Sequence, residues 1–244
     1  IGLIKVGDIT CCCLDGYNCD VYKFLKNDYL TVSVYTIINK VYEMIGRPID
    51  DISTLVNNCD QKVWDIYENG LTTTINQVDS DMGKQLIMKY KPKNISELSA
   101  FIAGIRPAFK SLIEKLVNRE HFSYHIDILD KLLQTEELPE SFILYQEQIM
   151  KILAFSGIPL DDCYTVIKSI SKKRVKKIMH YKELFLKGMT DKLMEDGHLD
   201  NNTADRVSHQ IWGIIEDASS YGFNSSHSLS VSFDSLLAAY FKAL

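Results

Sequence analysis

The densest charge in the sequence lies between residues 163 and 187. This segment holds eight cations and one acid, Glu183, so its charge is +7, whereas the whole 244-residue chain carries −5. Like charges so close together repel one another unless solvent or a bound anion screens them. Two interpretations stay open, a solvated helix face or a site for phosphates. The cations are Lys168, Lys172, Lys173, Arg174, Lys176, Lys177, Lys182 and Lys187.

A single carboxylate, Asp28, follows a short apolar segment that ends at Leu25-Lys26. A carboxylate at the end of a strand can hold a divalent cation, because hard cations prefer anionic oxygens. A lone aspartate at such a place is also a common helix cap or turn residue. The spacing alone leaves both roles open.

A polar cluster marks the break between two expected helices near residues 221–227. Gly222 and Asn224 interrupt the chain there, and His227 falls in the first turn of the second helix. Backbone N–H groups at a helix start favour anions, so Tyr221, Asn224 and His227 could bind a nucleotide. The alternative is a tight corner with an exposed histidine.

Four residues with polar groups interrupt an apolar stretch between Leu144 and Ile149. They are Tyr145, Gln146, Glu147 and Gln148. Buried polar groups cost free energy unless they are hydrogen-bonded, so a cluster of this kind needs partners or water. We expect these residues to shape a cleft if several of them face the same side.

The cysteines predict no disulfide framework. Three of them are adjacent, and disulfides join residues whose side chains converge from separate segments. A zinc site is possible by composition, but reduced thiols in the cytosol are favoured. The six are Cys11, Cys12, Cys13, Cys19, Cys59 and Cys163.

The composition indicates a soluble, mainly helical protein. Apolar residues make up 46% of the chain, which suffices for a sizeable core, and five prolines with twelve glycines favour helix. The net charge excludes a globally basic nucleic-acid binder. We expect no membrane association, because no apolar run approaches about 18 residues. The chain starts at Ile1, without a Met or a signal peptide, so we expect a cytoplasmic piece of a longer protein.

Apolar periodicity and capping residues place the elements that would position these groups. Extended pieces are expected at Leu3–Val6, Val21–Leu25 and, briefly, Leu71–Val78. Helices are expected at 31–45, after Asp60, at Met82–Tyr90, after Asn94, at Phe142–Phe155, after Asp161 or Asp162, at Val175–Met194, from Asn202 or Thr203 to Ile215, and at Asn224–Leu244.

Six segments, taken in order, resemble segments of the bacterial C-family replicative DNA polymerases, the DNA polymerase III alpha subunits. Each is quoted with the family pattern that it resembles: Leu25–Leu30 (Val-Lys-Phe-Asp-Phe-Leu), Gln77–Met82 (Gln-x-Glu-Ser-x-x-Met), Ile105–Pro107 (Arg-Pro-Gly-Pro), Tyr145–Met150 (Tyr-Gln-Glu-Gln-x-Met), Ser171–Arg174 (Gly-Lys-Lys-Lys) and Tyr221–Ser228 (Tyr-Gly-Phe-Asn-Lys-Ser-His-Ser).

The resemblance implies a mainly α protein, a multi-helix fingers domain at residues 30–244 with a small β portion from the palm at residues 1–29. It implies template-directed nucleotidyl transfer by two Mg²⁺ ions. Asp28 would be one metal-binding carboxylate and Lys26 a catalytic cation, while the other carboxylates lie outside this chain. We therefore expect this chain alone to be inactive.

The resemblance also implies partners and residue roles. The partners would be primer-template DNA, dNTP and the rest of the polymerase chain, with the sliding clamp and other replisome proteins as further candidates. The residues expected to bind the nucleotide are Lys168, Lys172, Lys173, Tyr221, Asn224, His227 and Arg106; those expected to shape the cleft are Gln77, Tyr145, Gln146, Glu147 and Gln148.

Some positions depart from the family pattern. Ile167 and Lys168 stand where the family has two arginines, and Ser171 stands where it has a glycine. An arginine fork that grips phosphate in two places is thereby reduced to a point charge. An alternative function stays open on this ground, a catalytically inactive fingers-like module that binds nucleic acid or has a structural role.

Overall fold

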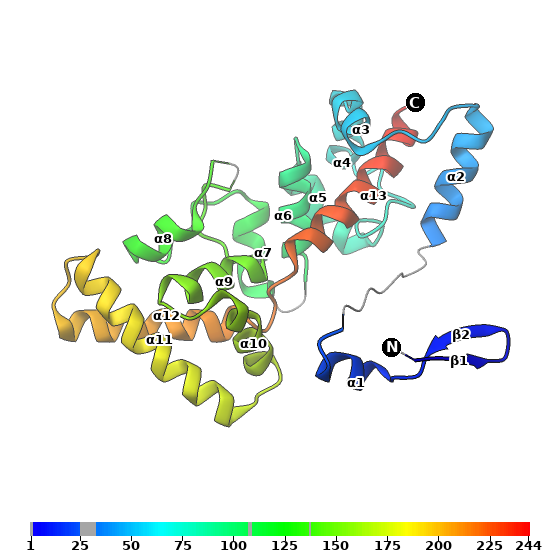
Figure 1. Ribbon diagram of the computed structural model, residues 1–244. Helices are drawn as coiled ribbons and strands as arrows, with labels where there is room; N and C mark the ends of the chain where they lie inside the picture. The colour runs from blue at the N-terminus through cyan, green and yellow to red at the C-terminus, as the bar shows by residue number, and fades with distance from the viewer. Residues whose placement is uncertain (1, 25–32, 107–108, 137) are drawn as a thin grey trace. The chain divides into compact units, whose positions relative to one another are not determined.

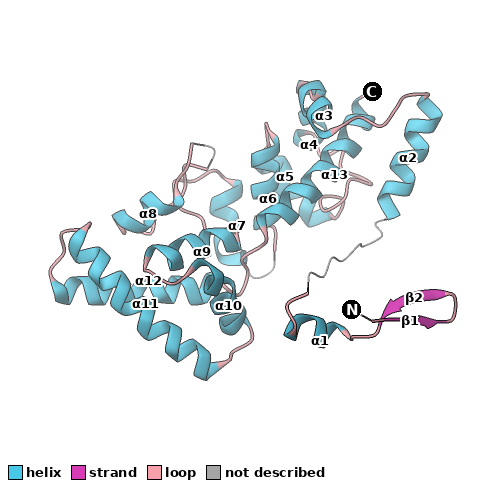
Figure 2. Cartoon of the chain, in the orientation of Figure 1, coloured by secondary structure: helices cyan, strands magenta, loops and turns pink. Residues whose placement is uncertain are grey.

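The computed structural model describes residues 2–24, 33–106, 109–136 and 138–244 (Figure 1). The chain divides into two compact units, residues 1–49 and residues 50–244. The described residues form thirteen helices and one two-stranded sheet, which confirms the mainly α fold with a small β portion (Figure 2). The expected palm–fingers boundary at residues 29 and 30 lies outside the described residues and stays a prediction.

The first unit begins with an antiparallel hairpin of β1 (Leu3–Val6) and β2 (Ile9–Cys12), in which Leu3 pairs with Cys12. Helix α1 (Gly16–Val21) follows, and the Asp15 carboxylate accepts the Asn18 N–H at 2.7 Å. The predicted extended piece at Val21–Leu25 is wrong over its described part, because α1 ends at Val21 and a turn follows, in which Lys23 has a φ of 58° and Phe24 N donates to Cys19 O at 2.9 Å. Helix α2 (Ser33–Ile45) confirms the periodicity and ends at Gly46, whose φ is 64°.

The second unit starts with five helices, several of which are capped by side chains. Asp60 and Asn94 cap their helices as expected, while α3 and α7 were not predicted. The predicted β-like stretch Leu71–Val78 is wrong. It forms turns in which Ile75 N donates to Thr72 O at 2.9 Å and Val78 N to Ile75 O at 3.2 Å. The helices are α3 (Ile52–Asn58), α4 (Gln61–Glu68), α5 (Asp81–Tyr90), α6 (Ile95–Gly104) and α7 (Lys110–Val117).

Six more helices follow, and three predicted starts need correction. The helix expected from Phe142 begins at Gln146. The helix expected after Asp161 or Asp162 begins at Leu160, with Pro159 at its N-cap position. The helix expected from Asn202 or Thr203 begins at Asn201, capped by Asp200. The helices are α8 (Asp127–Leu133), α9 (Gln146–Phe155), α10 (Leu160–Ser171), α11 (Val175–Glu195), α12 (Asn201–Ala218) and α13 (Ser225–Ala243).

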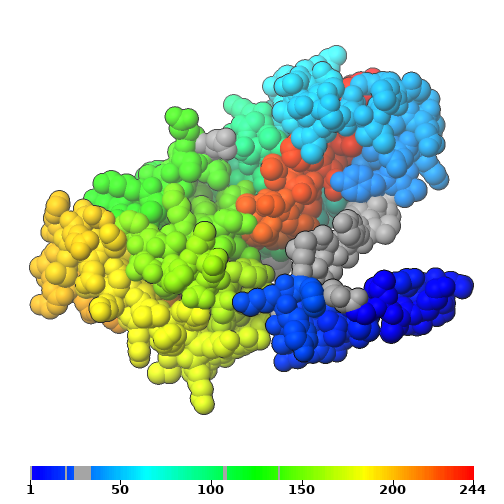
Figure 3. Space-filling model, viewed as in Figure 1, coloured from blue at the N-terminus to red at the C-terminus, as the bar shows by residue number. Residues whose placement is uncertain are grey.

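Two apolar cores hold the second unit together. In one, α13 packs against α4 and α6, and Tyr67 Oη lies 3.0 Å from Ser235 Oγ (Figure 1). In the other, α9–α12 enclose Phe185 and Trp212, whose ring centroids are 5.2 Å apart. Tyr221, between α12 and α13, packs against both cores. Part of α13 reaches the surface (Figure 3), and no described helix is long and apolar enough to span a bilayer.

Candidate functional site

The corner between α12 and α13 turns sharply at Gly222, whose N–H donates to Ala218 O at 2.7 Å. A Cβ at this position would lie 3.2 Å from both Ala218 O and Ile149 Cδ1, and 3.4 Å from Gln146 Cγ. Such contacts are tighter than side chains usually make, so a residue without Cβ lets the turn approach α9 closely. Gln146 is thereby placed directly against the corner.

The start of α9 is bound to this corner by main-chain and side-chain hydrogen bonds. Gln146 N donates to Phe223 O at 2.9 Å, and Phe223 N donates to Leu144 O at 3.0 Å. The Glu147 carboxylate accepts from Asn224 Nδ2 and from Ser225 N, each at 3.0 Å. A negative charge at the first turn of α13 also interacts favourably with the helix dipole. The segments at 145–148 and 221–228 thus form one structure.

The side-chain amides of Gln148 and Asn224 form hydrogen bonds within this structure. Gln148 Oε1 accepts from Leu144 N at 2.8 Å and Tyr145 N at 2.9 Å, and its Nε2 donates to Phe142 O at 3.0 Å. Because Gln148 accepts hydrogen bonds from the backbone of Leu144 and Tyr145, α9 begins at Gln146, later than predicted. Asn224 Oδ1 accepts from His227 N at 2.9 Å, while its Nδ2 is held by the Glu147 carboxylate.

A cavity of about 210 Å³ opens beside the start of α13. The Tyr145 hydroxyl lies 3.1 Å from Ser99 Oγ in the cavity wall, and Ser99 Oγ lies 3.1 Å from the buried Ser228 Oγ behind it. Sequence reasoning missed Ser99 and its contact with Ser228, because nothing in the spacing joins residues 129 positions apart. The cavity is lined by Ser96, Ser99, Leu138, Tyr145, Ser225, Ser226 and Leu229.

Arg106 reaches the same corner through Phe223. The guanidinium carbon of Arg106 lies 3.4 Å from the centre of the Phe223 ring, a cation–π contact. Burial lowers the pKa of Arg106, and its Nε has no hydrogen-bond partner among the described residues. The Phe223 ring also contacts the exposed ring of His227 edge-on, with 5.0 Å between the ring centroids.

Tyr221 is held as a neutral hydroxyl. Burial, with a smaller contribution from the Asp217 carboxylate, raises the pKa of Tyr221 to about 12, and Tyr124 shares a hydrogen bond with it. The Tyr221 ring packs edge-on against Phe109 at 5.3 Å. A phenol that stays protonated at neutral pH can donate or accept a hydrogen bond without adding charge.

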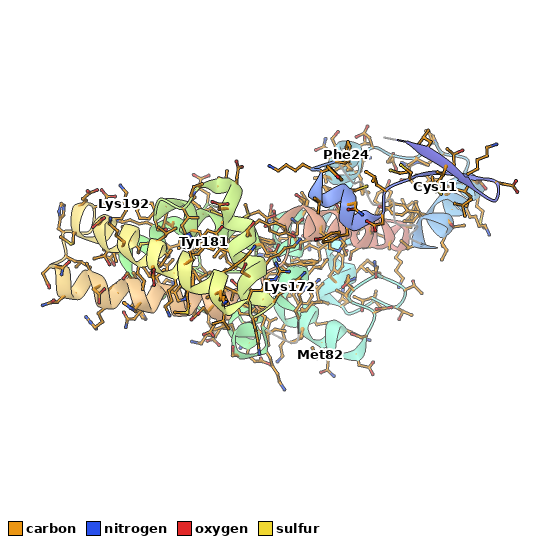
Figure 4. The ribbon with its side chains drawn as sticks, turned by 60° about the horizontal axis from the view of Figure 1, so that its bottom comes forward. Cys11, Phe24, Met82, Lys172, Tyr181 and Lys192 are labelled. Carbon is orange, nitrogen blue, oxygen red and sulfur yellow. The ribbon has the colours of Figure 1, made fainter. Side chains whose placement is uncertain are left out.

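Part of the cationic segment is anchored beside the corner by Ser171. Its hydroxyl donates to Ser219 O at 2.8 Å, which ties the end of α10 to the end of α12. Lys172 ends α10, Lys173 follows with a φ of 52°, and both side chains are exposed. Lys192, near the other end of α11, lies away from this point (Figure 4). Ser171, which was expected to stand at the place of a family glycine, therefore makes a contact that a glycine side chain could not make.

Gln77 lies apart from these groups. It is exposed in the 71–80 loop, and this loop is held at the far end of α13, where Lys242 Nζ donates to Leu71 O at 2.8 Å and Thr73 O at 2.6 Å. Fifteen helical residues separate Lys242 from His227, which is about 22 Å along the axis. The structure does not bring Gln77 to the corner.

Other predicted groups lie outside the described residues or lack phosphate access. Asp28 and Lys26 fall in the 25–32 gap. Ile167, which was expected to stand at the place of a family arginine, has 1% of its surface exposed and belongs to the second core. In the described ranges no three His, Cys, Asp or Glu side chains cluster as metal ligands, and the described cysteines are free thiols.

Comparisons with known proteins give a consistent family match. A family model described as the bacterial DNA polymerase III alpha subunit finger domain matches residues 34–193. The chain is 32% identical over 232 residues to the DNA polymerase III subunit alpha of Ureaplasma parvum, covering 91% of this chain and 22% of that protein. The subunit of Aquifex aeolicus is 31% identical over 226 residues (90% and 19%), and that of Escherichia coli K12 is 27% identical over 235 residues (90% and 19%). The chain thus spans about a fifth of the length of these relatives.

Proposed function

This chain belongs to the finger domains of bacterial DNA polymerase III alpha subunits, and on that premise we propose that it is the nucleotide-gripping part of a DNA polymerase. Its ligand would be the triphosphate of an incoming dNTP paired with primer-template DNA. The observation that carries this proposal is the convergence of three separate motif segments, at 145–148, 171–174 and 221–228, on one corner of the second unit.

The electrostatics of the corner suit an anion. Lys172 and Lys173 are exposed beside it, and they carry the attraction for phosphate, because Glu147 and Asn224 already accept hydrogen bonds from the N-terminus of α13. Fingers that carry such charges neutralise the phosphates of the nucleotide, and their closure over a correct base pair assembles the reaction site. The primer strand would supply the attacking 3′-hydroxyl, and the rest of the polymerase chain would hold it.

The side chains of the corner divide into two groups by their hydrogen bonds. Glu147, Gln148 and Asn224 bond to backbone or to each other, so their role is to position the corner. The exposed Lys172 and His227 remain to face the ligand. Tyr221, whose hydroxyl bonds to Tyr124 and whose ring packs on Phe109, helps to position the corner.

Magnesium chemistry is proposed for the longer protein. Mg²⁺ would activate the primer hydroxyl and stabilise the leaving pyrophosphate. The described residues do not provide a set of ligands for it. Asp28 stays the predicted contribution of this chain to the metal site.

A second candidate function rests on Ile167. A buried aliphatic residue in place of a phosphate-binding arginine is what a diverged module without catalysis would carry. Such a module would still hold nucleic acid through Lys172 and Lys173 but would not extend a primer.

Single-nucleotide insertion by the full-length polymerase tests the proposal. The variant Lys172→Ala/Lys173→Ala should raise the KM for dNTP by about ten-fold or more, because a charge-assisted hydrogen bond contributes about 1.5–3 kcal/mol. The control variant Lys62→Ala/Lys84→Ala removes two exposed cations from α4 and α5 and should leave the KM within two-fold. Equal effects of the two double variants would contradict the proposal, and a full-length protein that binds primed DNA without insertion would support the second candidate.

A further inference from the structure

One exposed aromatic side chain stands out in the second unit. Among its described residues, Tyr164 on α10 is the one tyrosine, phenylalanine or tryptophan whose side chain is exposed, with 46% of its surface accessible. Every other aromatic side chain described there is at least half-buried. A single exposed apolar residue is ordinary on a protein surface, so its surroundings decide its meaning.

A lysine lies against this ring. Lys168 Nζ is 4.6 Å from the centre of the Tyr164 ring, one helical turn further along α10. Both residues belong to the segment between 163 and 187, whose charge is +7. The residues of the α10–α11 turn, 172–174, are exposed. An exposed ring among cations is the combination with which proteins bind single-stranded nucleic acid, since bases stack on the ring and cations neutralise the phosphates.

The ring is also on the side of α10 that meets the candidate site. Tyr164, Lys168 and Ser171 are spaced i, i+4 and i+7, so they share one face of the helix. Ser171 Oγ donates to Ser219 O at 2.8 Å, so this face turns toward the corner between α12 and α13. Seven residues of helix place Tyr164 about 10 Å from Ser171 along the axis.

We propose that Tyr164 and Lys168 form a stacking platform for an unpaired base of single-stranded DNA that leads to the corner. Lys168 occupies one face of the ring, and the base stacks on the other. Lys172 and Lys173 continue the same surface toward the corner and neutralise the adjoining phosphates. The inference rests on the proposed function, because it takes the strand to be the template of the same polymerase.

Binding of a short single strand tests the platform in this chain. The probe is a fluorescently labelled oligo(dT) of twelve nucleotides, followed by anisotropy at low salt, with circular dichroism to confirm folding. Tyr164→Ala should weaken binding by about five-fold or more, since base–aromatic stacking contributes about 1–3 kcal/mol. Tyr164→Phe keeps the ring and should stay within two-fold. Met179→Ala removes an exposed apolar side chain from α11 in the same cationic segment and is the matched control.

Two results would overturn the proposal. One is binding by Tyr164→Ala equal to that of Met179→Ala. The other is binding by Tyr164→Phe as weak as that of Tyr164→Ala, because the hydroxyl group and not stacking would then be responsible.

The full-length polymerase separates this inference from the proposed function. Primer-templates with a template overhang of one or ten nucleotides are compared. The loss of affinity in Tyr164→Ala should be about five-fold larger on the longer overhang. An equal loss on both would place the ring against the nucleotide or the duplex and overturn the platform. The Lys172→Ala/Lys173→Ala variant could show a normal KM for dNTP while Tyr164→Ala still shows the larger loss on the longer overhang. That result would overturn the proposed function but still support the stacking platform.

Discussion

Removal of the Glu147 carboxylate should loosen the candidate site at its centre. This side chain accepts hydrogen bonds from Asn224 Nδ2 and Ser225 N, and it is half-buried between α9 and the start of α13. Its loss leaves two donors without their acceptor and removes a negative charge from the N-terminus of a 19-residue helix. We therefore expect Glu147→Ala to affect both folding stability and nucleotide binding.

The magnitude follows from these contacts. Hydrogen bonds to a charged group contribute about 1.5–3 kcal/mol, and a charge at a helix terminus adds about 0.3–1 kcal/mol. Partial exposure and replacement by water reduce the total, so Glu147→Ala should lower the free energy of unfolding by about 2–3 kcal/mol. Glu147→Gln keeps an oxygen acceptor and should lower it by about 1 kcal/mol.

Urea unfolding of the chain, followed by far-ultraviolet circular dichroism, measures this difference. The control is Glu114→Ala, because Glu114 makes an exposed ion pair with Lys89 at 3.6 Å and should contribute about 0.5 kcal/mol or less. In the full-length polymerase, Glu147→Ala should also raise the KM for dNTP. Equal unfolding free energies for Glu147→Ala and Glu114→Ala would refute the role of this carboxylate.

Four other substitutions test the packing and electrostatics of the second unit. Gly188→Ala should lower the free energy of unfolding by about 3 kcal/mol or more, because its Cβ would lie 1.8 Å from Ser156 O. Gly213→Ala is the control: no atom lies within 4 Å of its Cβ position, so it should be neutral or raise the free energy by up to about 1 kcal/mol. Similar unfolding midpoints for the two variants would contradict this. Burial acts to raise the pKa of Asp130, but four hydrogen bonds to its carboxylate outweigh this and lower the pKa. The ionised carboxylate therefore stabilises the folded chain above about pH 4, and this contribution is lost as the pH falls through the folded pKa. The difference in unfolding free energy between the native chain and Asp130→Asn should therefore shrink from pH 5 to pH 2, and a constant difference would contradict the cause. Ser171→Ala should cost about 1 kcal/mol in urea unfolding through its lost bond to α12, and an unchanged midpoint would show that this bond contributes nothing.

Local side-chain chemistry made several helix starts predictable. Asp60, Asn94 and Asn224 each cap the helix that follows, as their residue types and positions suggest. The helix ends at Gly46 and Gly157 were predictable as well, because glycine readily adopts the positive φ that ends a helix. The φ angles of these two glycines are 64° and 94°. These features depend on residues only a few positions apart, so local sequence patterns predict them.

Features that depend on distant contacts were not predictable. Ile75 and Val78 resemble a strand in sequence, yet both are buried within turns, where position in the core decides the conformation. Gln148 Oε1 accepts a hydrogen bond from Leu144 N, and α9 therefore begins later than the sequence predicts. The bond from Ser171 to Ser219 joins positions 48 residues apart, and no local pattern indicates it.

The candidate site was predicted in part. The sequence indicated Tyr145–Gln148 and Tyr221–His227 as functional segments, and the structure places them in contact. It did not distinguish side chains that build the corner, such as Gln148, from those left to face a ligand, such as Lys172, because hydrogen-bond partners are a property of the fold.

Photolabelling locates the triphosphate site most directly. The full-length polymerase on primed DNA is irradiated with an azido-dNTP, and the adducts are mapped by mass spectrometry. Adducts concentrated in 145–148, 168–174 and 221–228 are the predicted result. Adducts concentrated elsewhere, for example in the 71–80 loop at the other end of α13, would contradict the central claim that this corner grips the nucleotide.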